Sequence, residues 1–208
     1  MKHHNKMLLV GSVAAVTFGI NTSLPLVPQF GNTVTTVSAK SKAKEVTVGP
    51  GTYTVGKQIK PGRYTITSLS GSGNLTGEKK SDINIILGTE VDDDLGQVTS
   101  YTSSLKKGAK IKIDGIEQVN FKPVSKRKKL TILGAGDWVV GKDIKAGRYK
   151  ISALEGAGNI TDSDGEINEI LGTESDEDLG QVTHITTDLT KKQVISTDLQ
   201  QIQLTKEK

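Results

Sequence analysis

The stretch that decides the fold occurs twice in the chain. Residues 51–66 read Gly51-Thr-Tyr-Thr-Val-Gly-Lys-Gln-Ile-Lys-Pro-Gly-Arg-Tyr-Thr-Ile66, and residues 136–151 read Gly136-Asp-Trp-Val-Val-Gly-Lys-Asp-Ile-Lys-Ala-Gly-Arg-Tyr-Lys-Ile151. The match continues through Gly71-Ser-Gly-Asn74 and Gly156-Ala-Gly-Asn159, and through Leu95-Gly-Gln-Val-Thr99 and Leu179-Gly-Gln-Val-Thr183. Its offset is 85 residues and then 84. Because this period exceeds that of solenoid units, which need neighbours to bury a core, it predicts one small domain in two copies.

Each copy has the pattern of strands separated by turns. Arg63-Tyr-Thr-Ile-Thr67 and Lys110-Ile-Lys-Ile113 alternate apolar and polar residues, and 97–103 is rich in β-favouring types. Lys60-Pro-Gly-Arg63 is typical of a type II turn, with glycine where φ must be positive. We therefore predict an all-β fold of two tandem small β-sandwich (jelly-roll-like) modules.

One segment does not fit a plain strand. Ile83, Ile86 and Leu87 have i, i+3, i+4 spacing, which favours a single helical turn ending at Gly88 and, in the second copy, at Gly172. A strand with a bulge is the alternative.

The N-terminus has the pattern of an export signal. Lys2 and Lys6 precede an uncharged apolar run over 7–20, and Val37-Ser38-Ala39 resembles a cleavage site. The alternative is an uncleaved N-terminal anchor. The expected organisation is a signal peptide over 1–39, a short basic leader over 40–45, a first β module over 46–121, a basic linker over 122–129 and a second β module over 130–208.

Composition narrows the classes of partner. The chain has no cysteine, so no disulfide and no lipid on a cysteine is expected, and 203–208 carry no hydrophobic tail. Without residues 1–39 the chain has 25 basic and 23 acidic residues, a net charge of +2, which does not favour nucleic-acid binding. We expect a secreted, extracellular protein without a transmembrane anchor after cleavage, free or held non-covalently at the cell surface.

The repeated motif resembles a known group of modules. G-x-Y/W-x-V-G-x-x-I-x-x-G-R-Y-x-I, followed by G-x-G-N and a closing Leu105-Lys-Lys-Gly-Ala-Lys-Ile-Lys-Ile113, is similar to β-rich modules in secreted and surface proteins of Gram-positive bacteria. The resemblance covers nearly all of 46–208 and implies an extracellular module, but it brings no known activity. The family often has Leu-x-x-Gly-Asp in the closing segment. Here Ala109 replaces the Asp, and the second copy also loses the glycine, so we expect its last turn to be weaker.

Nothing in the pattern predicts catalysis. His184 is the one histidine after the leader, Ser100 occupies its place in the first copy, and no nucleophile elbow surrounds either. We expect no enzyme and no catalytic residue.

Acidic runs occupy the same place in both copies. Carboxylates gathered in a loop are the ligands that Ca²⁺ prefers, and a solvated acidic loop is the alternative. The candidate ligands are Glu90, Asp92, Asp93, Asp94, Glu174, Asp176, Glu177 and Asp178. No other cofactor is expected.

Aromatic and arginine residues of the repeated motif are candidate ligand-binding groups. Exposed aromatic rings stack on sugars and arginine binds carboxylates, whereas core or edge packing is the alternative. The candidates are Tyr53, Arg63, Tyr64, Trp138, Arg148 and Tyr149.

The linker carries a basic cluster. Lys126, Arg127, Lys128 and Lys129 are predicted to attract a polyanion such as a wall polymer, with a flexible hinge as the alternative. The expected function is a non-enzymatic protein that binds a cell-wall polymer or surface protein through two equivalent weak sites. The alternative is a structural spacer without a specific ligand.

Overall fold

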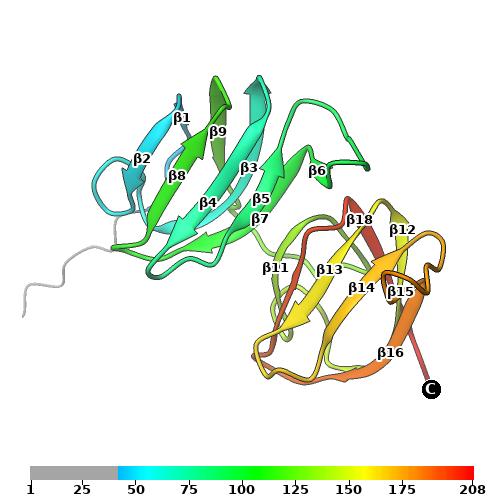
Figure 1. Cartoon of the computed structure of the whole chain (residues 1–208). Coiled ribbons are helices and arrows are strands. Elements are labelled where there is room, and N and C mark those ends of the chain that lie inside the picture. The colour runs from blue at the N-terminus through cyan, green and yellow to red at the C-terminus, as the bar shows by residue number, and fades with distance from the viewer. Residues whose placement is uncertain (1–41) are drawn as a thin grey trace, which may run out of the picture. The chain divides into compact units, whose positions relative to one another are not determined.

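The computed structural model describes residues 42–208, and all of its regular structure is β-strand (Figure 1). The prediction of an all-β fold is confirmed. The predicted signal peptide and its alternative, an N-terminal anchor, lie outside the described residues. Within 42–208 there is no helix with the length and apolar character to cross a membrane. The described residues 42–208 belong to one compact unit.

The first half of this unit contains nine strands in two sheets. One sheet has the order β1-β9-β3-β7, and the other has the order β2-β8-β4-β5-β6. The bounds are β1 Val46–Val48, β2 Gly51–Thr54, β3 Gly62–Ser70, β4 Gly73–Glu78, β5 Asn84–Leu87, β6 Gln97–Val98, β7 Ser100–Leu105, β8 Lys110–Asp114 and β9 Gln118–Pro123.

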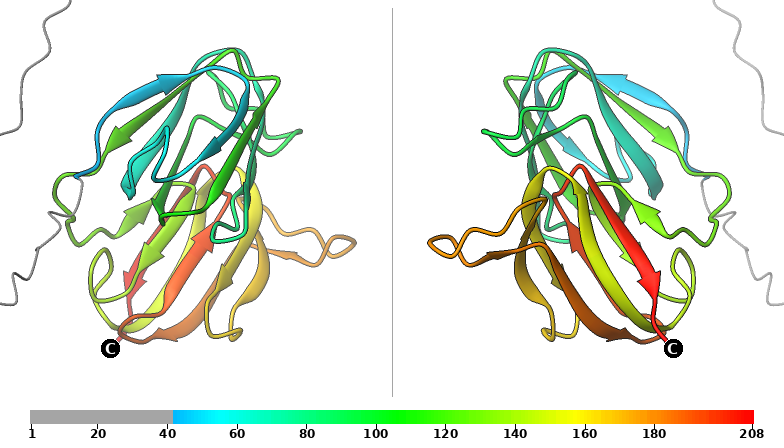
Figure 2. Two further views of the ribbon diagram at one scale, coloured as in Figure 1. Left: turned by 90° about the vertical axis from the view of Figure 1, so that its left-hand side faces the viewer. Right: turned by 90° about the vertical axis from the view of Figure 1, so that its right-hand side faces the viewer.

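The second half repeats this strand order. Its sheets have the orders β10-β18-β12-β16 and β11-β17-β13-β14-β15, so each strand has a counterpart nine positions earlier. Figure 2 shows the first half in blue to green and the second in yellow-green to red. The bounds are β10 Ile132–Leu133, β11 Gly136–Val139, β12 Gly147–Glu155, β13 Ala157–Asp162, β14 Asn168–Gly172, β15 Gln181–Val182, β16 His184–Leu189, β17 Val194–Thr197 and β18 Gln201–Lys206.

The two halves meet edge to edge. β7 of the first half pairs in parallel with β11 of the second at Thr102 and Gly136, which joins two sheets into one of nine strands. The amide of Thr102 donates to the carbonyl of Ala135 at 3.0 Å. We call this contact and the side chains around it the joint.

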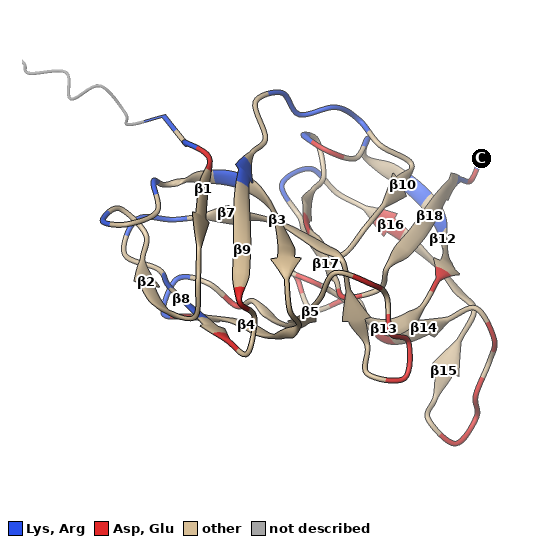
Figure 3. Cartoon of the chain, turned by 90° about the horizontal axis from the view of Figure 1, so that it is seen from above, with Lys and Arg blue, Asp and Glu red and all other residues tan. Residues whose placement is uncertain are grey.

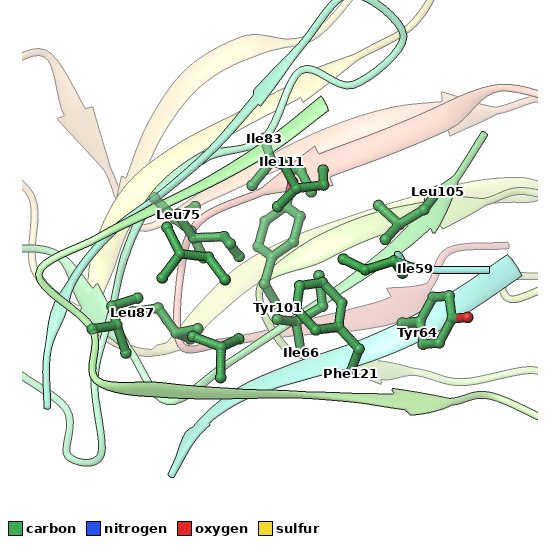
Figure 4. Close-up of a cluster of buried hydrophobic side chains, with 14 of the residues drawn as sticks. Ile59, Tyr64, Ile66, Leu75, Ile83, Leu87, Tyr101, Leu105, Ile111 and Phe121 are labelled. Atoms are coloured by element: carbon green, nitrogen blue, oxygen red, sulfur yellow. The ribbon is translucent and has the colours of Figure 1, made fainter. Parts of the chain in front are cut away.

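Each half buries its own apolar cluster, as the alternation along the strands predicts. Tyr64 and Ile66 of β3 are fully buried, and the ring of Tyr64 meets that of Phe121 edge-on at a centroid distance of 6.1 Å (Figure 4). The second cluster contains Tyr149 and Ile151, the counterparts of Tyr64 and Ile66. Ala135 belongs to the second half but packs into the first cluster, so the joint is also an apolar contact.

The predicted helical turn at 83–87 is wrong. Asn84–Leu87 form β5, which pairs with β4 and with β6, and Asn168–Gly172 form β14 in the second half. Ile83, Ile85 and Leu87 are all buried, which is the period of two that a strand gives. The helical spacing arose because Ile86, on the other face, is also apolar.

The predicted type II turn at 60–63 is also wrong. Gly62 has no positive φ and is the first residue of β3. A β-carbon on Gly62 would collide with the side chain of Ala43, so close approach explains the glycine here. Its counterpart Gly147 has φ +145, a conformation that L-residues rarely adopt.

The closing turn of the second half is strained, which agrees with the expected weakness there. Lys192 has φ +80, and in the first half Gly108 has φ +88 at the same place. We expect Lys192→Gly to raise the free energy of unfolding by about 0.5–1 kcal/mol, because glycine relieves the left-handed strain and loses part of this gain to its more flexible unfolded chain. Urea unfolding would measure the change. Lys191→Gly is the matched control, since Lys191 has no positive φ, and it should lower stability; a loss in both variants would contradict the explanation.

Candidate functional site

A cavity of about 540 Å³ lies beside the joint. Both halves contribute to its wall, and most of the lining side chains are hydroxyl-bearing or charged. The residues are Arg63, Lys80, Ser81, Asp82, Tyr101, Ser103, Ser104 and Lys106 from the first half, and Asp137, Val139, Thr161, Asp162, Ser163, Val194 and Ser196 from the second. We call it the joint cavity.

The carboxylate of Asp137 is the centre of a hydroxyl network in this cavity. The phenol of Tyr101 and the hydroxyl of Ser196 donate to its Oδ1 at 3.1 and 2.9 Å. The hydroxyl of Ser103 donates to its Oδ2 at 2.5 Å. Hydrogen bonds to a charged acceptor are stronger than those between neutral groups, so this network fixes β11 against β7.

Tyr101 acts in this network as a hydrogen-bond donor. Burial raises the pKa of the Tyr101 phenol well above its ordinary value, and the negative charge of Asp137 raises it further. The phenol therefore stays protonated at neutral pH and does not serve as a base.

Arg63 crosses the joint from β3. Its guanidinium lies 5.2 Å from the centroid of the Trp138 ring, in cation–π geometry, and Nη2 donates to the carbonyl of Asp137 at 2.8 Å. Nη2 also lies 3.3 Å from a carboxylate oxygen of Asp143. Burial lowers the pKa of Arg63, and the charge of Asp143 opposes this effect. Nη1 donates to the hydroxyl of Ser104 in the same half at 3.2 Å, so groups of both halves hold the buried cation, and the anion comes from the second half.

Asp143 also binds a second arginine, Arg127, which lies in the predicted linker. Arg127 forms an ion pair with it, and Nε of Arg127 donates to Oδ1 at 2.6 Å. The amide of Val139 donates to Oδ2 at 2.9 Å. Burial alone would raise the pKa of the Asp143 carboxyl, but these hydrogen bonds and the charges of Arg63 and Arg127 hold it below its ordinary value.

Two of the four basic linker candidates thus already have partners in the second half. Arg127 is bound to Asp143, and Nζ of Lys129 donates to the carbonyl of Gly141. Lys126 and Lys128 are exposed and stay candidates for contact with a polyanion. β9 extends to Pro123, two residues into the range predicted as linker.

The aromatic candidates are not equivalent in the structure. Tyr64 and Tyr149 are buried core residues, so neither ring presents a face to a ligand. Trp138 is covered by Arg63 and its indole donates to the carbonyl of Gly134 at 2.8 Å. Tyr53 is half-buried and donates in the same way to the carbonyl of Gly49 at 2.9 Å. Packing accounts for all four.

The two arginine candidates lie in different surroundings. Arg63 is buried in the joint, whereas Arg148 is exposed and pairs with Asp188 at 2.9 Å. The structure therefore does not bring the six aromatic and arginine candidates into one site.

The acidic runs form tight loops. Asp92 accepts a hydrogen bond from the amide of Leu95, and Asp176 accepts from the amides of Asp178 and Leu179. This is the side-chain capping that aspartate provides in turns. The other acidic candidates, Glu90, Asp93, Asp94, Glu174, Glu177 and Asp178, are exposed. Among residues 42–208 no three His, Cys, Asp or Glu side chains are grouped so that they could hold a metal ion.

His184 is exposed at the start of β16, and its Nδ1 lies 3.1 Å from the hydroxyl of Thr183. It does not line the joint cavity. The polar groups that do converge there, around Asp137, come from other elements.

The central residues of the joint cavity were not among the candidates predicted from the sequence. Asp137, Tyr101, Ser103 and Ser196 correspond to Thr52, Ile185, Thr187 and Lys112 in the other half. These positions differ between two copies that are otherwise closely similar. Divergence of this kind was the available signal, because a contact between copies needs each copy to supply different groups.

Comparison of the chain with family models, with curated proteins and with solved structures gives no match.

A substitution at Gly136 would test the close backbone contact at the joint. A β-carbon there would lie 2.8 Å from the backbone nitrogen of Thr102, whereas at Gly51, with nearly the same φ, it would meet only the Tyr53 side chain at 3.6 Å or more. We expect Gly136→Ala to lower the free energy of unfolding by about 1–3 kcal/mol more than Gly51→Ala. Urea unfolding would measure this, and hydrogen exchange at Thr102 would show opening of the joint. Equal effects would mean that φ alone explains both glycines.

The pKa of Asp143 predicts a pH dependence. Because its folded pKa lies below the unfolded value of about 4, its contribution to stability is complete above pH 4 and is lost as pH falls through the folded pKa. The difference in unfolding free energy between the parent protein and Asp143→Asn should therefore shrink on acidification below pH 4. Asp188→Asn, which removes an exposed partner, is the control and should have a small effect at every pH. A difference for Asp143→Asn that does not change with pH would contradict the assignment.

Proposed function

We propose that this protein is a secreted, non-enzymatic binding protein that associates with a cell-wall polymer or another surface polymer through the joint cavity. The observation that carries the proposal is the convergence of Asp137, three hydroxyls and exposed charged side chains in one open cavity. Its secretion rests on the signal-like N-terminal pattern of the sequence.

The chemistry of the cavity favours a hydroxyl-rich ligand that carries both signs of charge. The hydroxyl oxygens that donate to Asp137 keep lone pairs that can accept hydrogen bonds from sugar hydroxyls. Lys80 and Lys106 are exposed at the cavity and suit carboxylates or phosphates, while Asp82 and Asp162 suit amines. A glycan of the bacterial wall with charged substituents has this combination.

The arrangement supports binding more than catalysis. Asp137 already accepts three hydrogen bonds, and the phenol of Tyr101 is held protonated. A general base needs a lone pair that is free to take up the proton, and three of the roughly four acceptor positions of Asp137 are occupied. The one histidine of the described chain, His184, lies outside the cavity.

A structural spacer is the second candidate, and the joint itself favours it. The two halves are joined by a continuous sheet, a buried arginine and a shared apolar contact at Ala135. Such a contact would hold the two halves at a fixed spacing, which a spacer requires and a flexible tether does not provide.

Co-sedimentation with isolated Gram-positive cell walls tests the proposal. Residues 40–208 should bind saturably at 50 mM and at 500 mM salt, values of about one-third and three times physiological ionic strength. Lys80→Ala combined with Lys106→Ala should weaken binding about tenfold, because it removes two charged donors at the cavity.

The matched control removes the same charge from the linker, through Lys126→Ala combined with Lys128→Ala. Binding should survive this change. If the control variant loses as much affinity as the cavity variant, the interaction is a general attraction to the basic surface. Absence of binding by the parent protein would leave the spacer.

A further inference from the structure

Each half has a second edge of the kind that forms the joint. The joint pairs β7 with β11; the counterpart of β7 in the second half is β16, and the counterpart of β11 in the first half is β2. β16 and β2 are the outermost strands of their sheets, with no strand beyond them in residues 42–208. Unpaired edges of this kind are templates for pairing with another chain.

The edge at β16 exposes residues whose counterparts in the first half are buried at the joint. Thr102 is buried in β7, whereas Thr186 at the same place in β16 is exposed. The exposed fraction of Val98 is 2%, and that of its counterpart Val182 is 37%. Ile185, which replaces the buried Tyr101, is half-buried. The second half therefore leaves open a surface that its twin covers.

The edge at β2 keeps the backbone that the joint needs. Gly51 has φ +144 and Gly136 has φ +146, so the two strands begin with the same conformation. In the joint the amide of Thr102 donates to the carbonyl of Ala135. Pro50 occupies the place of Ala135 and is exposed, and the missing N–H of proline does not matter because the contact uses only the carbonyl.

We propose that copies of this protein associate head to tail, with β16 of one copy pairing in parallel with β2 of the next in the register Thr186 to Gly51. This inference does not depend on the proposed wall binding. The contact is heterologous, so it leaves a free β2 at one end and a free β16 at the other, and further copies can add.

The side chains around the two edges are compatible with this pairing. Arg148 holds the place of Arg63, and Tyr53 holds the place of Trp138, so a cation–π contact can form again. Gln58 holds the place of Asp143: its Oε1 accepts from the amide of Thr54 at 3.0 Å, as Asp143 accepts from Val139.

Charge complementarity replaces part of the hydroxyl network. In the joint, Ser104 faces a cavity that is also lined by Val194 and Ser196. Their counterparts are Asp188 on β16, and Lys110 and Lys112 on β8 beside β2. Asp188 already pairs with Arg148 at 2.9 Å and Lys112 with Asp114 at 3.0 Å, so Lys110 is the basic group that would meet Asp188 without giving up an ion pair. Figure 3 shows both kinds of charge over these segments.

This contact should be weaker than the joint. Thr52 stands in place of Asp137, so the carboxylate that gathers three hydroxyls is missing. Glutamine in place of Asp143 also leaves Arg148 without a buried anion. Reversible association that depends on concentration is therefore expected.

Cysteine cross-linking tests both the partner and the register. In the joint, the side chains of Ser103 and Asp137 touch at 2.5 Å, and their counterparts are Thr187 and Thr52. The protein has no cysteine of its own, so an equimolar mixture of Thr187→Cys and Thr52→Cys proteins can form a disulfide only between introduced residues. Under mild oxidation, residues 40–208 carrying these changes should give a covalent heterodimer. One chain carrying both changes should give a ladder of oligomers.

Two controls separate this contact from random collision and from a symmetric dimer. Thr47→Cys places a cysteine on the exposed edge strand β1, and its mixture with Thr187→Cys should give only background. Dimers of Thr187→Cys alone at the level of the mixture would indicate pairing of β16 with β16 and would overturn the proposal.

Thr186→Pro tests the hydrogen bond. By the register of β12 with β16, the amide of Thr186 faces away from β12, as that of Thr102 faces away from β3, so proline removes an outward donor and spares the ladder. In sedimentation velocity, the weight-average mass of the parent protein should rise with concentration, and Thr186→Pro should raise the dissociation constant about tenfold. Circular dichroism and the urea midpoint would show that the variant is folded. A parent protein that stays monomeric up to millimolar concentration, or a folded Thr186→Pro that associates equally well, would overturn the proposal.

Discussion

The burial of one arginine at the contact of β7 with β11 constrains the rest of the structure. A guanidinium removed from water needs an anionic partner and hydrogen-bond acceptors. Arg63 finds one acceptor, the hydroxyl of Ser104, in its own half, but its anion Asp143 and the carbonyl of Asp137 belong to the other half. Those partners are in reach because Gly136 lets the backbone of β11 come close to Thr102. Separating the halves would break the contacts of Arg63 with Trp138, Asp137 and Asp143 together with the edge pairing, so the two sets of contacts form and are lost together.

Duplication explains why such a contact has free counterparts. Two copies of one fold that meet through unlike edges necessarily leave one edge of each kind unused, here β2 and β16. The copies then diverged at the contact: Asp137 and Tyr101 support it, while Thr52 and Ile185 occupy the same places at the ends. The chain therefore has one strong joint and two edges that retain its backbone geometry with weaker side-chain chemistry.

The sequence predicted much of the fold because the relevant signals are local. Alternation at 63–67 and 110–113 identified β3 and β8, and the repeat implied that both halves have the same strand order, as they do. Local signals failed where two explanations share one pattern. The spacing of Ile83, Ile86 and Leu87 fits a helical turn as well as a strand with an apolar outer face, and Gly62 serves close approach to Ala43 instead of a turn.

The candidate site was less accessible to sequence reasoning, because it is assembled from residues far apart in the chain. Asp137 and Tyr101 are separated by 36 residues, and Asp137 and Ser196 by 59. The acidic runs have the composition of a Ca²⁺ loop, yet the side chains of Asp92 and Asp176 cap their own loops. The buried aromatic residues of the repeated motif, such as Tyr64 and Tyr149, recur because they form the core of each copy.

The joint also changes how two copies should act in binding. Two equivalent sites would make the tandem a bivalent version of one module, with avidity set by the linker between them. The joint cavity instead takes Tyr101 and Ser103 from one half and Asp137 and Ser196 from the other, so neither half contains it alone. On the proposed function, the unit that binds is therefore the pair, and affinity depends on the integrity of the joint more than on the number of copies. Head-to-tail association would then add whole pairs, each with its own cavity, and avidity would arise between chains.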